Sequence, residues 1–253
     1  MSLKWLMNAS MALGFWMSAC AQANSAQANS IPVKLRAQDG VLISALDYEA
    51  SRPKAIILLF HQAGSSKAEY ATIAPRLAAD GYSALAIDQR SGGALYGPNE
   101  TASRLNRPAT YEEAKLDLMA AYDWALSRHL PILLWGSSYS AALIFEVAAE
   151  HADRVSAILA FSPGEYLETE GEVTHAAARV RVPIYVTSSS DADEIQAGHA
   201  ILSASPARIR TQFVPKFGVH GSSTLIEARN PKGAAENWDH VLAFLAALPE
   251  PPG

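Results

Sequence analysis

The chain of 253 residues contains a single cysteine, Cys20, so no disulfide bond can form within it. It has no cluster of lysine and arginine, and its net charge is −5, which argues against a nucleic-acid-binding protein. No G-x-G-x-x-G sequence follows the first expected parallel strand, so nothing supports a dinucleotide site. Hydrophobic residues make up 49% of the chain, enough for one sizeable core.

The N-terminal thirty residues differ from the rest of the chain. Lys4 precedes a short apolar run that polar residues interrupt, which predicts a signal peptide over residues 1–20 and not a membrane span. The sequence Met17-Ser18-Ala19-Cys20 resembles a bacterial lipobox, whose cysteine carries lipid and becomes the mature N-terminus. Ordinary cleavage near Ala23 or Ala28 is the alternative. Residues 21–30 repeat Ala-Gln-Ala-Asn-Ser twice, which predicts a flexible linker before a domain at residues 31–253. We therefore expect a secreted or periplasmic protein, anchored to a bacterial membrane if Cys20 is acylated.

From residue 31 onward, expected strands alternate with expected helices. Two strands around Asp39-Gly40 predict an N-terminal hairpin, and continuous apolar runs such as 55–60 and 82–87 predict strands buried on both faces. The spacings Ser66-x-x-Glu69 and Thr110-x-x-Glu113 predict capping boxes that begin helices. This alternation indicates an α/β fold with a mostly parallel sheet and helices on both faces.

The segment 131–140 predicts a buried strand that turns sharply into a helix, with Ser138 at the tip. Such a turn is the nucleophile elbow, which exposes a serine hydroxyl at a helix N-terminus. The usual pattern is G-x-S-x-G, and Ser140 replaces its last glycine here. Because glycine and serine are also common in turns, an ordinary strand-to-helix turn is the competing interpretation.

A serine nucleophile needs a base to accept its proton. Five histidines follow Ser138, and only His220 lies in a loop directly after an expected strand. Gly218 and Gly221 flank it and would allow the backbone to approach a site closely. Because sites in such sheets lie at the carboxyl ends of the strands, His220 is the predicted base.

The acid that orients the base should follow the preceding strand, at 183–187. Asp191 comes first after that strand and is our predicted acid, with Asp193 as its rival. We expect Glu194 to lie in the first turn of the next helix, stabilised there by the helix dipole. Glu165, one strand earlier, is a weaker alternative.

The negative charge of an acyl-transfer transition state requires backbone N–H donors. The amide of Tyr139, directly after Ser138, is one predicted donor. The loop after the strand at 55–60 should supply the other, and Ala63 is the preferred residue, with Gln62 second.

Several segments together resemble the α/β-hydrolase superfamily. The segment Leu59–Ser65 is similar to its His-Gly loop, with Gln62 in place of glycine, and 81–93 is similar to its strand ending in Asp-x-Arg-Gly. The elbow and His220 follow in the superfamily's order, and no insertion is long enough for a large cap domain. This compact form resembles the dienelactone hydrolase-like branch.

The resemblance implies a serine hydrolase that cleaves small carboxylic esters or lactones through an acyl-enzyme on Ser138, with no metal or organic cofactor. Segments 91–109 and 164–178 would line its pocket. A peptidase or thioesterase on the same residues remains an alternative, as does a non-catalytic binding lipoprotein that keeps the fold. The sequence leaves the oligomeric state open.

The lipobox interpretation predicts that Cys20 carries lipid. Full-length protein expressed in a bacterial host with labelled palmitate should take up label, whereas Cys20→Ala should not. Equal labelling of the two proteins, or none in either, would favour ordinary cleavage near Ala23 or Ala28.

Overall fold

The structure is a computed structural model that describes residues 30–249, so the predicted signal peptide, Cys20 and most of the predicted linker lie outside the described residues. Its eight strands form one sheet in the order β1-β2-β4-β3-β5-β6-β7-β8. The strands are β1 (Ser30–Arg36), β2 (Leu42–Tyr48), β3 (Ala55–Phe60), β4 (Tyr82–Ile87), β5 (Ile132–Ser137), β6 (Val155–Phe161), β7 (Ile184–Thr187) and β8 (Arg210–Phe213).

The helices lie between the strands along the chain. They are α1 (Ile73–Ala79), α2 (Glu100–Leu105), α3 (Tyr111–Leu126), α4 (Tyr139–Glu150), α5 (Glu172–Ala177), α6 (Ala192–Ala204) and α7 (Ala234–Ala246), with the 3-10 helices η1 (Lys67–Tyr70) and η2 (Gly221–Leu225). The pairs β1–β2 and β2–β4 are antiparallel, and the remaining pairs of the sheet are parallel. The predicted α/β fold with an N-terminal hairpin is therefore confirmed.

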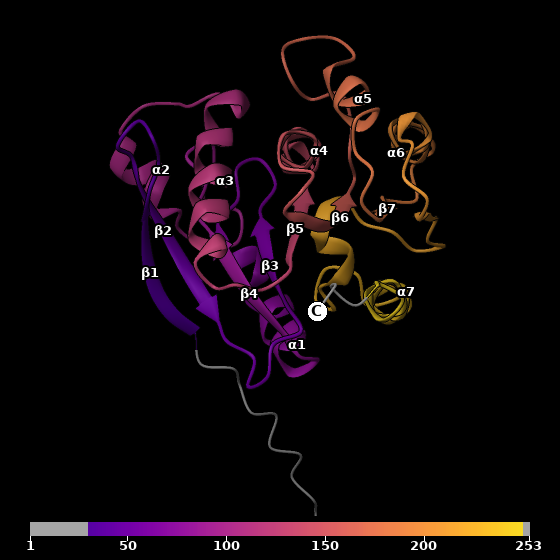
Figure 1. Ribbon diagram of the computed structural model, residues 1–253, viewed down its shortest axis with the longest axis horizontal. Helices are drawn as coiled ribbons and strands as arrows, with labels where there is room; N and C mark the ends of the chain where they lie inside the picture. The colour runs from indigo at the N-terminus through magenta and orange to yellow at the C-terminus, as the bar shows by residue number, and fades with distance from the viewer. Residues whose placement is uncertain (1–29, 250–253) are drawn as a thin grey trace, which may run out of the picture.

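Helices cover both faces of the sheet (Figure 1). The α3, α4, α5 and α6 helices pack on one face and α1 and α7 on the other. Because side chains alternate along a strand, Ile56 and Leu58 of β3 enter the first core while Ile57 and Leu59 enter the second. No helix within residues 30–249 is long and apolar enough to cross a bilayer.

One of the two predicted capping boxes is wrong. Thr110 and Glu113 form the expected box at the start of α3. Ser66 instead caps the short η1 helix through Ala68 N, and Glu69 turns into the interior, where it is 1% exposed. The single helix expected from Ser66 onward is therefore divided into η1 and α1, because Glu69 finds its hydrogen-bond partners in the core.

Candidate active site

The candidate site lies at the carboxyl ends of the parallel strands. Strands β5, β6, β7 and β8 are consecutive neighbours in the sheet, and β3 lies on the other side of β5. The loops that leave these strands carry Ser138, His220 and Ala63, so residues far apart in sequence meet at one edge. This is the edge at which α/β sheets place their ligand sites.

The turn after β5 has the geometry of a nucleophile elbow. Ser138 has φ 61° and ψ −125°, a strained backbone for a residue with a side chain. Its amide donates to the carbonyl of Phe161 on β6 at 2.8 Å. A Cβ added to Gly136 would lie 2.5 Å from Ser140 O and 2.6 Å from Ala141 Cα. Glycine is therefore required at position 136, because α4 passes this close to β5.

The departure from the elbow pattern at Ser140 has a structural reason. The Ser140 hydroxyl donates to the His61 carbonyl at 2.5 Å and accepts from Gln89 Nε2 at 2.6 Å. The hydroxyl that replaces the usual glycine thus links the elbow helix to the loop after β3. Ser140 has no exposed surface, and both of its hydrogen-bonding roles are satisfied there.

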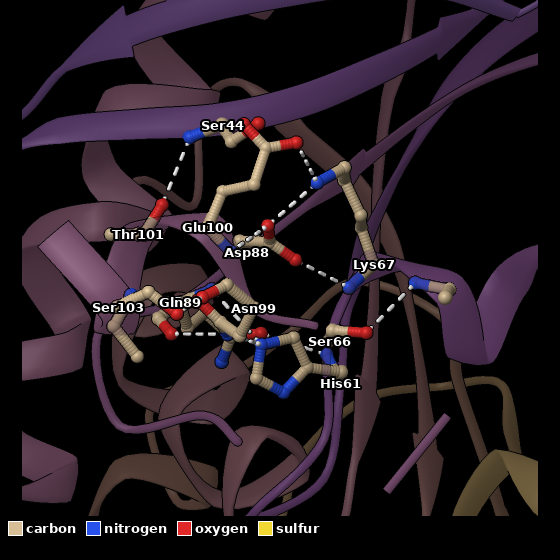
Figure 2. Close-up of polar contacts among 12 residues, drawn as sticks. Ser44, His61, Ser66, Lys67, Asp88, Gln89, Asn99, Glu100, Thr101 and Ser103 are labelled. Carbon is tan, nitrogen blue, oxygen red and sulfur yellow. Dashed lines mark hydrogen bonds and ion pairs between the residues drawn. The ribbon is translucent and has the colours of Figure 1, made fainter. Parts of the chain in front are cut away.

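His61 anchors the loop after β3 from within the core. Its Nε2 accepts from Gln89 N at 2.9 Å, and its Nδ1 lies 2.8 Å from Gln62 O, which fixes Nδ1 as the protonated nitrogen. Figure 2 shows His61 beside Gln89 and Asn99, with the Lys67–Asp88 ion pair nearby. Burial lowers the pKa of His61 to about 4, so the ring is neutral near pH 7.

The amides of the two predicted oxyanion donors have no partner among the described residues. Tyr139 is the first residue of α4, so its amide needs no partner within the helix. Among residues 30–249, the amides of Ala63 and Tyr139 make no hydrogen bond to the protein, whereas the Gln62 amide donates to Glu69 at 3.1 Å. Of the two residues predicted for this role in the loop, Ala63 is therefore the one whose amide is available, and Gln62 is not.

His220 is held by a carboxylate, but not by the one expected. Its Nδ1 lies 2.8 Å from Glu194 Oε1. Burial opposes ionisation of Glu194, but hydrogen bonds from His220, Ser162 and the Ser189 amide outweigh it and lower its pKa to about 2. Glu194 is therefore ionised at neutral pH. With Nδ1 hydrogen-bonded to this carboxylate, Nε2 is the ring nitrogen left to accept a proton.

The predicted contact between Asp191 and His220 is wrong. Asp191 is exposed and caps α6, where its side chain accepts from Asp193 N at 2.9 Å. Glu194 is the third residue of α6 and has the longer side chain, which reaches the loop after β8. The spacing Asp191-x-x-Glu194 is itself a helix-cap signal, and it could have assigned Asp191 to the cap.

Close backbone contacts bring the His220 loop against the elbow. Ser222 N donates to Ser137 Oγ at 2.9 Å, and Gly221 N donates to Ser162 Oγ at 2.9 Å. A Cβ on Gly221, which has φ +65°, would lie 2.4 Å from Ser137 Oγ. Among residues 30–249 the Ser138 hydroxyl makes no hydrogen bond to His220, and such contacts often tighten only when substrate binds.

A shallow cavity of about 400 Å³, largely open to solvent, lies near the elbow helix, between the start of α3 and the segment after β6. Its wall is formed by Ala109, Thr110, Tyr111, Glu112, Tyr166, Leu167 and Glu168. The Tyr166 hydroxyl donates to Ser162 O at 3.3 Å. Tyr111 stacks on the Tyr139 ring with centroids 4.2 Å apart.

Three side chains of segment 91–109, the other segment predicted to line the pocket, have different partners. Tyr96 hydrogen bonds to Ser223, which also accepts from Gln62 Nε2 at 3.2 Å. Arg104 and Arg107 instead form exposed ion pairs with Glu100 and Glu113, respectively. Within residues 30–249, no three His, Cys, Asp or Glu side chains group so as to hold a metal ion.

The fold and this edge of the sheet define an α/β-hydrolase. Residues 51–197 match the family model described as "Serine aminopeptidase, S33", which covers more than half of the chain. The chain therefore belongs to this α/β-hydrolase family, and the predicted superfamily is confirmed. No curated protein matches the sequence.

Solved structures share the fold at low sequence identity. A dienelactone hydrolase from Anabaena variabilis is 19% identical with a TM-score of 0.68, over 88% of this chain and 100% of that one. An esterase from Pyrococcus furiosus is 18% identical with a TM-score of 0.64, over 96% and 97% of the two chains. A carboxyl esterase from Bacillus coagulans is 12% identical with a TM-score of 0.69, over 87% and 98%.

Glu194 and Asp191 should have separable roles. Glu194→Gln should slow labelling of the protein by a fluorophosphonate about 100-fold or more, because the imidazolium of His220 would lose its charged partner. Asp191→Ala should leave that rate within about threefold and lower the free energy of unfolding by about 1 kcal/mol, because a helix cap is lost. A larger loss of reactivity in Asp191→Ala than in Glu194→Gln would contradict this assignment.

Buried His61 should make stability depend on pH. Its pKa falls from 6.5 to about 4 on folding, so between these values the unfolded chain binds a proton that the folded protein does not. The His61 contribution to the free energy of unfolding is therefore fully present above pH 6.5 and is lost progressively as pH falls from 6.5 to about 4. Lowering the pH from about 7 to about 5 should remove about 2 kcal/mol of it.

Urea unfolding of wild type and His61→Gln at both pH values isolates this contribution. The comparison is needed because the pKa values of buried Asp47 and Asp117 are raised to about 6, which changes stability in the opposite direction. The destabilisation caused by His61→Gln should shrink by about 2 kcal/mol at the lower pH. An equal destabilisation at both pH values would show that His61 is not held neutral.

Proposed function

We propose that this protein is a serine hydrolase that cleaves carboxylic esters or lactones through an acyl-enzyme on Ser138. The observation that carries the proposal is that the strained Ser138 turn and the Glu194–His220 pair lie at the same edge of the sheet, after β5, β7 and β8. Strain of this kind persists only where the surroundings impose it, and it concentrates at functional sites. The esterases and the dienelactone hydrolase that share the fold support an ester substrate.

In this proposal Ser138 Oγ attacks the carbonyl carbon while His220 Nε2 accepts the hydroxyl proton. Ionised Glu194 stabilises the imidazolium through Nδ1. The amides of Ala63 and Tyr139 donate to the oxyanion of the tetrahedral intermediate. The imidazolium then protonates the leaving alkoxide, and a water activated by His220 hydrolyses the acyl-enzyme and releases the acid.

The cavity beside Tyr166 would hold one substituent of the substrate. Its volume of about 400 Å³ suits a small group, and the rings of Tyr111 and Tyr166 give it aromatic walls. Glu112 and Glu168 also contribute to the wall. Two carboxylates would repel an anionic substituent, so we propose that this cavity takes one that carries no negative charge.

Two alternatives use the same scaffold. A peptidase is supported by the family description, but no ester preference or peptide preference follows from the triad alone. The departures from the superfamily pattern at Gln62 and Ser140 are the reason to consider a non-catalytic binding protein. Both side chains have hydrogen-bond partners that connect the loops of the site, which favours an enzyme.

Ser138→Ala should reduce hydrolysis of p-nitrophenyl acetate by about 1,000-fold or more, because the covalent step is lost. It should also abolish labelling by a fluorophosphonate. The free energy of unfolding should stay within about 0.5 kcal/mol of wild type, since the small hydroxyl contributes little to packing.

Ser127→Ala is the matched control, because Ser127 is an exposed serine directly after the end of α3. It should keep wild-type turnover. Unchanged turnover in Ser138→Ala would eliminate Ser138 as the nucleophile. Wild-type protein that cleaves amino-acid p-nitroanilides but no ester would instead favour the peptidase.

A further inference from the structure

Glu69 is a buried carboxyl group directly behind the site. It lies on η1, is 1% exposed, and has no part in the proposed chemistry. Burial raises its pKa, while hydrogen bonds from Ser137 and the Gln62 amide act in the opposite direction. Burying a carboxyl group costs free energy unless hydrogen bonds compensate it, so its partners are informative.

Its two partners, and one residue bound to them in turn, belong to the three segments that form the site. Glu69 Oε2 accepts from Gln62 N at 3.1 Å, in the loop that carries Ala63. Glu69 Oε1 accepts from Ser137 Oγ at 2.7 Å, next to the nucleophile. Ser137 Oγ in turn accepts from Ser222 N at 2.9 Å, two residues after His220. One carboxyl group thus connects the oxyanion loop, the elbow and the histidine loop.

The hydrogen bond from Gln62 N to Glu69 is the last of four that fix the backbone directly before Ala63. His61 N donates to Gln89 Oε1 at 2.7 Å, and His61 O accepts from Ser140 Oγ at 2.5 Å. Gln62 O accepts from Ser65 N at 3.2 Å. With Gln62 N bound to Glu69, every backbone N–H and C=O group of His61 and Gln62 has a hydrogen-bond partner. The next amide along the chain is that of Ala63.

We propose that Glu69 is a positioning residue that holds the Ala63 amide in place for the oxyanion by binding the Gln62 amide and, through Ser137, the elbow and the histidine loop. This inference rests on the ester hydrolysis proposed above. An oxyanion hole stabilises the transition state only when its donors are fixed before the reaction. Loss of the Glu69 contact should therefore reduce kcat and leave ground-state binding unchanged.

Glu69→Leu removes both acceptors with little change of volume. It should lower kcat for p-nitrophenyl acetate about tenfold to a hundredfold, less than the loss of a whole oxyanion donor. KM should stay within about threefold, and Ki for a trifluoromethyl ketone, which mimics the tetrahedral intermediate, should rise in parallel with the fall in kcat/KM.

Glu69→Gln is the conservative variant. Its amide oxygen can accept from Gln62 N while its NH₂ group donates to Ser137 Oγ, so kcat should return to within about threefold of wild type. Asp47→Asn is the matched control, because Asp47 is also a buried carboxyl, 2% exposed, but lies near the amino ends of β3 and β5. It should change stability and leave kcat and Ki unaltered.

Ser137→Ala tests the same connection if Glu69→Leu does not fold, and it should lower kcat and weaken ketone binding in the same ratio. Wild-type kcat and Ki in the folded Glu69→Leu, or in Ser137→Ala where Glu69→Leu is unfolded, would overturn the inference while leaving ester hydrolysis intact. Equal kcat losses in Glu69→Leu, Glu69→Gln and Asp47→Asn would also overturn it, since they would follow from destabilisation alone. Wild-type protein that neither hydrolyses esters nor binds the ketone would overturn both proposals.

Discussion

The turn at Ser138 is the constraint on which the rest of the site depends. A positive φ costs a residue with a side chain about 1–3 kcal/mol, and the packing around the turn must supply that free energy. Gly136 allows α4 to lie against β5, and the Ser138 amide is bound to β6. Because the proposed nucleophile and the Tyr139 donor are consecutive residues, fixing this one turn fixes the spacing between hydroxyl and amide.

Buried polar groups maintain the loops around that turn. His61, Gln89 and Ser140 are fully buried and hydrogen bond to one another across three separate segments. Such a network is stabilising only when its members are satisfied, and each of these bonds also fixes a loop that leaves the sheet. Ser140, which departs from the family pattern, is therefore better understood as a member of this network than as a weakened elbow.

The sheet and the elbow could be predicted from the sequence because they depend on local signals, namely continuous apolar runs and a glycine-serine turn. The contacts of Glu69 and Glu194 could not be predicted in this way. Ser66, Thr110 and Asp191 each precede a glutamate by three residues, and only Glu113 closes a capping box. Glu69 and Glu194 turn toward the site because loops distant in sequence offer them partners. A cap pattern cannot reveal such long-range contacts, although it correctly places the cap residue.

The proposed base and nucleophile follow strands that differ greatly in how far they are buried from solvent. Ser138 follows β5, a fully buried strand with a neighbour on each side, whereas His220 follows β8, an edge strand whose residues are half-buried or exposed. Edge elements with few buried contacts open at lower free energy than the core. On heating, β8 and the partly exposed segment 214–219 should therefore open before β5 does, which would displace His220 while the elbow is still folded. The protein would then lose activity reversibly before it loses its fold, and its working temperature would be set by β8.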